Sequence, residues 1–118
     1  VNSTYTKYIL YVDTLHGSQG GTVYLDINKT GGSHTMTLFS NTGNEPSDWH
    51  FAEVHISFDV YIRAWAQALT NTEGGGGYSN TSSISGSLSA SGTPSSITLR
   101  SPNSGLNSGY LRLYGVKS

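Results

Sequence analysis

The segment from Glu53 to Ala68 alternates between apolar and polar side chains for sixteen residues. A period of two over this length predicts extended β-structure, because an α-helix would scatter both sets of side chains around its axis. The even positions are apolar and form one face: Val54, Ile56, Phe58, Val60, Ile62, Ala64, Ala66 and Ala68. The odd positions form a second face that is polar and aromatic: Glu53, His55, Ser57, Asp59, Tyr61, Arg63, Trp65 and Gln67. We therefore expect the first face to lie on a core and the second to be available to a partner.

Further strand-like runs, separated by turn-forming residues, occupy positions 4–12, 22–28, 34–40, 78–91, 97–100 and 109–117. The alternating segment is longer than the usual strand of about 3–10 residues, so we expect a bend, a bulge or a break near Asp59. Glycines predict a tight hairpin turn at Thr30–Gly32 and a flexible turn at Asn71–Gly77. About eight or nine short strands, with no helical periodicity, predict an all-β fold: an antiparallel, jelly-roll-like β-sandwich.

Length and composition narrow the function classes. A chain of 118 residues predicts a single domain spanning 1–118. There are no cysteines, which excludes disulfides and thiolate metal sites. The net charge is −1 and the six Lys and Arg residues form no basic patch, so we expect no nucleic-acid partner. No apolar run approaches the roughly 20 residues needed to span a bilayer, so we expect no membrane insertion.

The polar face of the alternating segment is the first candidate binding site. Tyr61 and Trp65 would lie about 13 Å apart on one strand face, with Arg63 between them. Aromatic rings stack on the C–H faces of sugars, while Asp59, Arg63 and Gln67 could bond their hydroxyl groups. The pattern therefore favours a saccharide ligand. Two other interpretations stay open: a subunit interface, where Tyr, Trp and Arg are enriched, and a plain sheet surface.

The loop 44–50 is the second candidate, because it places Glu45, Asp48, Trp49 and a histidine close together. Loops on rigid sheets often carry recognition residues. The same residues are also ordinary turn formers, so this loop could be purely structural.

Catalysis and metal binding have no comparable signal. Glu53 and Asp59 would lie near 20 Å apart on a straight strand, whereas glycosidase carboxylates are about 5–10 Å apart. The histidines, His16, His34, His50 and His55, show no spacing typical of metal ligands, and His50 and His55 should point to opposite faces of one strand. We therefore expect no catalytic residue, no metal and no cofactor.

The end of the chain reads GYLRLYGVKS, and residues 94–105 read PSSITLRSPNSG. This ending resembles the carboxy-terminal end of many bacteriophage tail-fibre, tailspike and related virion proteins. The resemblance implies a β-sandwich domain at the carboxy terminus of a longer chain, commonly a homotrimer in the virion tail that binds host-surface glycans. It carries over no individual binding or catalytic residue.

Together, these observations predict a non-enzymatic phage receptor-binding domain that attaches to bacterial cell-surface saccharide, located in the virion tail or otherwise extracellular. The expected ligand-binding residues are Asp59, Tyr61, Arg63, Trp65, Trp49, Asp48 and Glu45. One alternative is a structural virion domain for trimerisation, the tail tip or head decoration. Others are a carbohydrate-binding module of a bacterial enzyme and an esterase or glycosidase.

Overall fold

The computed structural model describes residues 5–17, 21–42, 49–58, 61–74, 77–88, 94–101 and 106–117. These segments contain no helix and consist mainly of β-strands. The strands are β1 (Lys7–Gly17), β2 (Gly21–Lys29), β3 (Gly32–Thr42), β4 (Trp49–Phe58), β5 (Ile62–Gly74), β6 (Gly77–Leu88), β7 (Pro94–Arg100) and β8 (Leu106–Gly115). The prediction of an all-β fold is confirmed.

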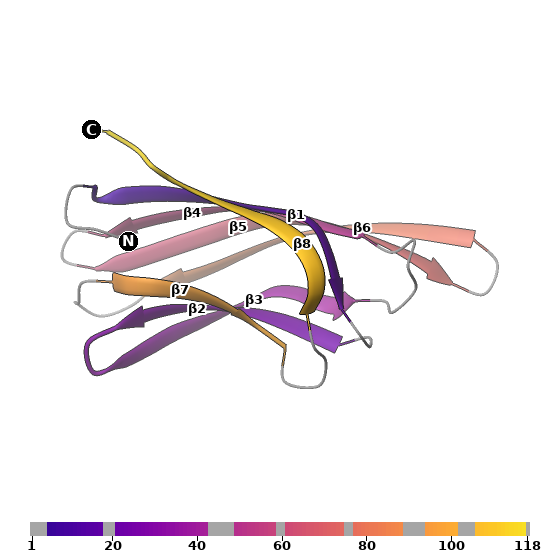
Figure 1. Ribbon diagram of the computed structural model, residues 1–118, viewed down its shortest axis with the longest axis horizontal. Helices are drawn as coiled ribbons and strands as arrows, with labels where there is room; N and C mark the ends of the chain where they lie inside the picture. Colours follow the sequence, from indigo (N-terminus) through magenta and orange to yellow (C-terminus); the bar gives the residue numbers. More distant parts are fainter. Residues whose placement is uncertain are drawn as a thin grey trace.

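The strands form two antiparallel sheets that lie one above the other (Figure 1). The larger sheet has five strands in the order β6-β5-β4-β1-β8, and the smaller has three in the order β3-β2-β7. Strand β3 contacts β4, β5 and β6, so the smaller sheet covers the β6 side of the larger one. The opposite side of the larger sheet ends in β8. This sandwich-like arrangement leaves one whole face of the five-stranded sheet, which we call the outer face, turned away from the smaller sheet.

The alternating segment forms a hairpin rather than one long ribbon. Strand β4 ends at Phe58 and β5 begins at Ile62, and these two residues are opposite each other in the ladder. The predicted break near Asp59 is therefore confirmed, although Asp59 itself lies outside the described residues. The division into two faces is also confirmed, because Val54 and Ala66 are opposite each other and both are buried. Folding the segment back on itself brings the two halves of its polar face side by side.

The core lies between the two sheets and is built from the inward positions of five strands. Its buried members are Leu10, Val12, Val23, Leu25, Ile27, Met36, Leu38, Phe39, Ala52, Val54, Ile56, Ile62, Ala64, Ala66 and Ala68. Removing this apolar surface from water is the main favourable term for folding. His50 is also fully buried, whereas His55 lies on the outer face, so the prediction that they point to opposite faces is confirmed.

A β-bulge explains one departure from simple alternation. Leu38 and Phe39 are neighbours in β3, yet both are buried. The register shifts at this point, from Val23 opposite Phe39 to Tyr24 opposite Thr37. The extra residue of a bulge rotates the strand and lets consecutive side chains face one side.

The two predicted glycine turns have different outcomes. Gly31 has a φ of 86°, which favours glycine, and the hairpin turn at Thr30–Gly32 is confirmed. The flexible turn predicted for Asn71–Gly77 is too long. Strand β5 continues to Gly74 and pairs with β6 from Gly77 onward, because Asn71 to Gly74 extend the antiparallel ladder.

The side of the smaller sheet that faces away from the core carries an ion pair between the buried Asp26 and the exposed Arg100. Arg100 donates to both carboxylate oxygens of Asp26, at 2.7 and 3.1 Å, and the Thr35 hydroxyl donates at 2.6 Å. The Arg100 guanidinium also lies over the Tyr24 ring, 4.8 Å from its centroid. The hydrogen bonds from Arg100 hold the pKa of Asp26 below its usual value of 3.8; burial opposes this effect, and Thr35 adds to it. The pair ties β2 to β7 and β3.

Asp26→Asn is expected to lower the free energy of unfolding by about 1–3 kcal/mol at pH 7, because hydrogen bonds to a charged group are lost. The folded pKa of Asp26 lies below the unfolded one. The stabilisation that the Asp26 carboxylate contributes is therefore complete at pH values above the pKa of the unfolded state. It is lost as the pH falls through the pKa of the folded state. Urea unfolding at pH 7 and pH 3 should show a difference between wild type and Asp26→Asn that shrinks at pH 3. Asn28→Ala, which removes neutral hydrogen bonds to Ser96 and Thr98, is the control. A difference that does not change with pH would contradict this role.

Candidate functional site

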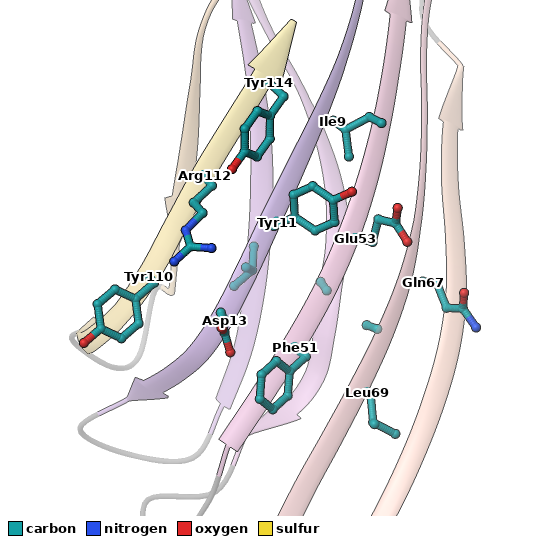
Figure 2. A pocket seen from close by; sticks show the side chains of 13 residues that line it. Ile9, Tyr11, Asp13, Phe51, Glu53, Gln67, Leu69, Tyr110, Arg112 and Tyr114 are labelled. Atoms are coloured by element: carbon teal, nitrogen blue, oxygen red, sulfur yellow. The ribbon is translucent and has the colours of Figure 1, made fainter. Parts of the chain in front are cut away.

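The outer face of the five-stranded sheet is hollowed into a groove of about 810 Å³ (Figure 2). We call it the outer groove. It runs across four strands, β8, β1, β4 and β5, and lies on the side away from the smaller sheet. Its outward-pointing side chains are Ile9, Tyr11, Asp13, Phe51, Glu53, Gln67, Leu69, Tyr110, Arg112 and Tyr114.

The ladder registers arrange these side chains in rows across the strands. In the central row, Arg112 of β8 is opposite Tyr11 of β1, and Tyr11 is opposite Glu53 of β4. Glu53 is in turn opposite Gln67 of β5. Neighbouring strands lie about 4.8 Å apart, so this row spans roughly 14 Å across the sheet. One row contains a cation, a phenol, a carboxylate and an amide.

Aromatic rings line the β8 and β1 side of the groove. Tyr110, Arg112 and Tyr114 share one face of β8, and Tyr11 projects from β1 beside them (Figure 2). Tyr11 and Tyr114 pack edge to face, with ring centroids 5.8 Å apart and an interplanar angle of 76°. All three tyrosines are exposed. Exposed aromatic patches with a polar rim mark interaction sites, and their sheet positions hold these rings rigidly.

The polar side of the groove is organised around Glu53. His55 Nε2 lies 3.2 Å from Glu53 Oε1, which forms an ion pair when the histidine is protonated. The same imidazole stacks on the Trp65 ring, with centroids 4.2 Å apart and planes 1° from parallel. His55 therefore joins the groove residue Glu53 to Trp65 on β5.

The predicted site residues of the alternating segment lie on the same face as the groove. Tyr61 and Trp65 are 46% and 48% exposed, so neither ring is packed inside the chain. Arg63 lies over the Tyr61 ring, 5.7 Å from its centroid. None of these three residues lines the outer groove; they occupy the adjoining part of the outer face. The structure thus brings Tyr61, Arg63 and Trp65 onto one surface beside a hollow that is built from other residues.

The remaining predicted site residues lie outside the described residues, either wholly or in their side chains. Trp49 begins β4, but its side chain lies outside the described residues. Asp59, Asp48 and Glu45 also lie outside them.

The groove residues on β1 and β8 were missed by sequence reasoning. Tyr110, Arg112 and Tyr114 alternate with leucines at the end of the chain, and this pattern does reveal a shared face. No sequence signal states that this last strand pairs with the first one. The pairing of Tyr11 with Arg112 creates the groove wall, and it becomes visible only in the folded chain.

Within the described ranges, no three His, Asp or Glu side chains are grouped so that they could hold a metal ion. The same ranges include no helix that is long and apolar enough to cross a membrane. Comparison of the chain with family models, curated proteins and solved structures finds no match.

Proposed function

We propose that the protein is a non-enzymatic saccharide-binding domain whose binding site is the outer groove. The observation that carries the proposal is the combination of Tyr11, Tyr110 and Tyr114 with the hydrogen-bonding groups of the central row in one open hollow. Aromatic faces pack against the C–H surface of a pyranose ring. Carboxylate, amide and guanidinium groups bond its hydroxyls.

The dimensions of the groove suit a short oligosaccharide. A volume of about 810 Å³ falls within the roughly 300–1,000 Å³ that is typical of small-ligand sites. Side chains two residues apart on one strand lie about 7 Å from each other, close to the width of one sugar ring. Tyr110, Arg112 and Tyr114 are spaced in this way along β8, so successive sugar units can follow this strand.

The proposed biological role is attachment of a phage virion tail to bacterial cell-surface glycan. The chain ending that resembles tail-fibre and tailspike proteins forms β8, and β8 supplies Tyr110, Arg112 and Tyr114 to the groove. A single shallow site of this kind binds weakly. Presenting several copies together raises the overall affinity through avidity. The jelly-roll-like topology expected from the sequence belongs to the same proposal.

A bacterial glycan array followed by titration of the best ligand tests this proposal. Tyr11→Ala is expected to weaken binding about 5- to 30-fold, which corresponds to roughly 1–2 kcal/mol. Tyr61→Ala is the matched control, because both tyrosines are exposed on the same sheet face, at 40% and 46%, and only Tyr11 lines the groove. The control should change the affinity by less than about 3-fold, or roughly 0.6 kcal/mol.

Two results would contradict the proposal. If wild-type protein binds no saccharide on the array, the outer groove is not a glycan site. If Tyr61→Ala weakens binding while Tyr11→Ala does not, the ligand lies over the Tyr61 end of the outer face. Trp65→Ala, titrated in parallel, shows whether the bound saccharide extends past His55 to β5.

A further inference from the structure

Strand β8 is an edge of the five-stranded sheet. It pairs with β1 on one side, and no strand of the described residues pairs with its other side. Its inward side chains Leu111 and Leu113 are opposite the core residues Val12 and Leu10. Nevertheless they are 54% and 40% exposed, because the smaller sheet does not reach beneath them. Two leucines at core-facing positions are therefore left open to solvent.

The neighbouring edge of the smaller sheet is open as well. Ile97 and Leu99 of β7 pack against the core but are only partly buried. Both β7 and β8 are the last strands on the side away from β3. Among the described strands, the sandwich thus has an uncovered apolar side, and β8 forms its upper border (Figure 1).

The backbone of β8 has its free hydrogen-bonding groups at the leucine positions. The Val116 amide donates to the Lys7 carbonyl at 2.9 Å, so the even-numbered positions of this strand bond to β1. In an antiparallel ladder, alternate residues direct their N–H and C=O groups to opposite sides. Leu111, Leu113 and Gly115 therefore direct theirs to the free edge.

The other edge strands carry more features that discourage pairing than the final part of β8 does. Strand β6 is rich in serine, β3 contains the bulge near Phe39, and β7 begins with Pro94. Bulges and prolines are ordinary means of blocking edge-to-edge association, and serine side chains offer a second strand little apolar surface. The final part of β8, from Tyr110 to Gly115, has a single charge, at Arg112.

We propose that β8 pairs antiparallel with β8 of a second copy of this chain, around a two-fold axis normal to the sheet. Such an axis places equivalent outer faces on the same side, so opposite residues share a face. Two identical strands are self-complementary in this arrangement, because each edge offers the same donors and acceptors in reverse order. The occupant is a second copy, because two antiparallel β8 strands satisfy each other's free backbone groups and bring their exposed leucines together.

The side chains select the register. Centring the pair on Arg112 would oppose two guanidinium groups, which is destabilising. Gly109 has a φ of 150°, so the regular part of the strand begins after it, and this disfavours centring on Leu111. Centring on Leu113 places this residue opposite its equivalent and Arg112 opposite Tyr114 of the second copy. Leu111 then meets Gly115 of the second copy, where the ring of Tyr5 fills the space that a Cβ would occupy.

This pairing also changes the binding surface. The two outer faces become one continuous sheet surface, with both outer grooves open to the same side. Tyr110, Arg112 and Tyr114 of the two copies lie along the seam, so one extended saccharide chain could contact both grooves. The contact of one saccharide chain with both grooves rests on the proposed function, whereas the dimer is inferred from the geometry of the β8 edge alone.

Cysteine cross-linking tests the register, because the chain has no other thiol. Leu113→Cys is expected to form a disulfide-linked dimer under mild oxidation. Residues opposite each other in a hydrogen-bonded antiparallel pair have Cα atoms about 5.5 Å apart, within the roughly 4.4–6.8 Å that a disulfide allows. Ser33→Cys, an exposed position on the edge strand β3, is the matched control and should stay monomeric on non-reducing gels. Equal cross-linking of both variants would overturn the proposal.

Molar mass in solution, measured by light scattering without any ligand, tests the dimer independently of saccharide binding. Wild-type protein is expected to have twice the chain mass, and Leu113→Pro should raise the dimer dissociation constant at least 10-fold by removing an edge N–H. Leu113→Lys serves the same purpose if the proline variant does not fold, which circular dichroism shows. A wild-type monomer, a trimer, or a dimer unaffected by the folded Leu113 variants would overturn the proposal. If wild-type protein is a dimer but binds no glycan, only the proposed function is overturned.

Discussion

Val54→Asp is expected to leave the protein unfolded at 25 °C. Val54 is fully buried in the centre of β4, opposite Leu10 of β1 and Ala66 of β5. All three residues belong to the apolar core, so a carboxylate at position 54 would be surrounded by apolar side chains. Burying an unpaired charged group costs about 4 kcal/mol or more. Domains of this size have a total stability of only about 5–15 kcal/mol. Circular dichroism measures the loss of β-structure, and urea titration measures the loss of unfolding free energy.

Leu69→Asp is the control for this substitution. Leu69 lies on β5 and points to the outer face, where it is exposed. A carboxylate there stays hydrated, so the free energy of unfolding should change by less than about 1 kcal/mol. If Val54→Asp were tolerated as well as Leu69→Asp, the inward face of β4 would not be the core of the protein.

Leu25→Ala is expected to lower the free energy of unfolding by about 2–5 kcal/mol, the range found when a buried leucine is truncated and a cavity is left. Leu25 is completely buried at the centre of the smaller sheet, and its strand neighbours are Met36 and Leu99. Chemical denaturation of wild type and variant measures the difference. Leu69→Ala, the same truncation at an exposed position, should cost less than about 1 kcal/mol. If the two variants lost similar amounts of unfolding free energy, the inward side chains of β2 would not be part of the core.

The local features of the fold could be predicted from the sequence because they depend on neighbouring residues. The alternation of residues 53–68 predicts both the inward and the outward side chains, and its excessive length predicts the break that creates the β4–β5 hairpin. The glycine pair after Thr30 predicts a turn because Gly31 needs a positive φ. The start of the turn predicted for residues 71–77 was misplaced, because β5 continues to Gly74. Polar residues such as Asn71 continue an edge hairpin as readily as they form a loop.

The candidate site was only partly predictable, because half of it comes from long-range pairing. The sequence identifies the outer face through Trp65, Tyr61 and Arg63, and these residues do lie there. The groove itself depends on β8 aligning with β1, which no local pattern specifies. Only the ladder shows that Tyr11 and Arg112 are neighbours, and hence where the surface is concave.

The pairing of β1 with β8 joins strands near the two ends of the sequence, with Tyr8 opposite Gly115. Such distant partners form late, because the entropic cost of closing a long loop comes before the contacts that repay it. Residues as late as Gly115 must therefore leave the ribosome before the wall containing Arg112 and Tyr114 can be assembled. Translation products that stop before β8, or chains cleaved within β8, would lack that wall. They could not compete with complete copies for a ligand.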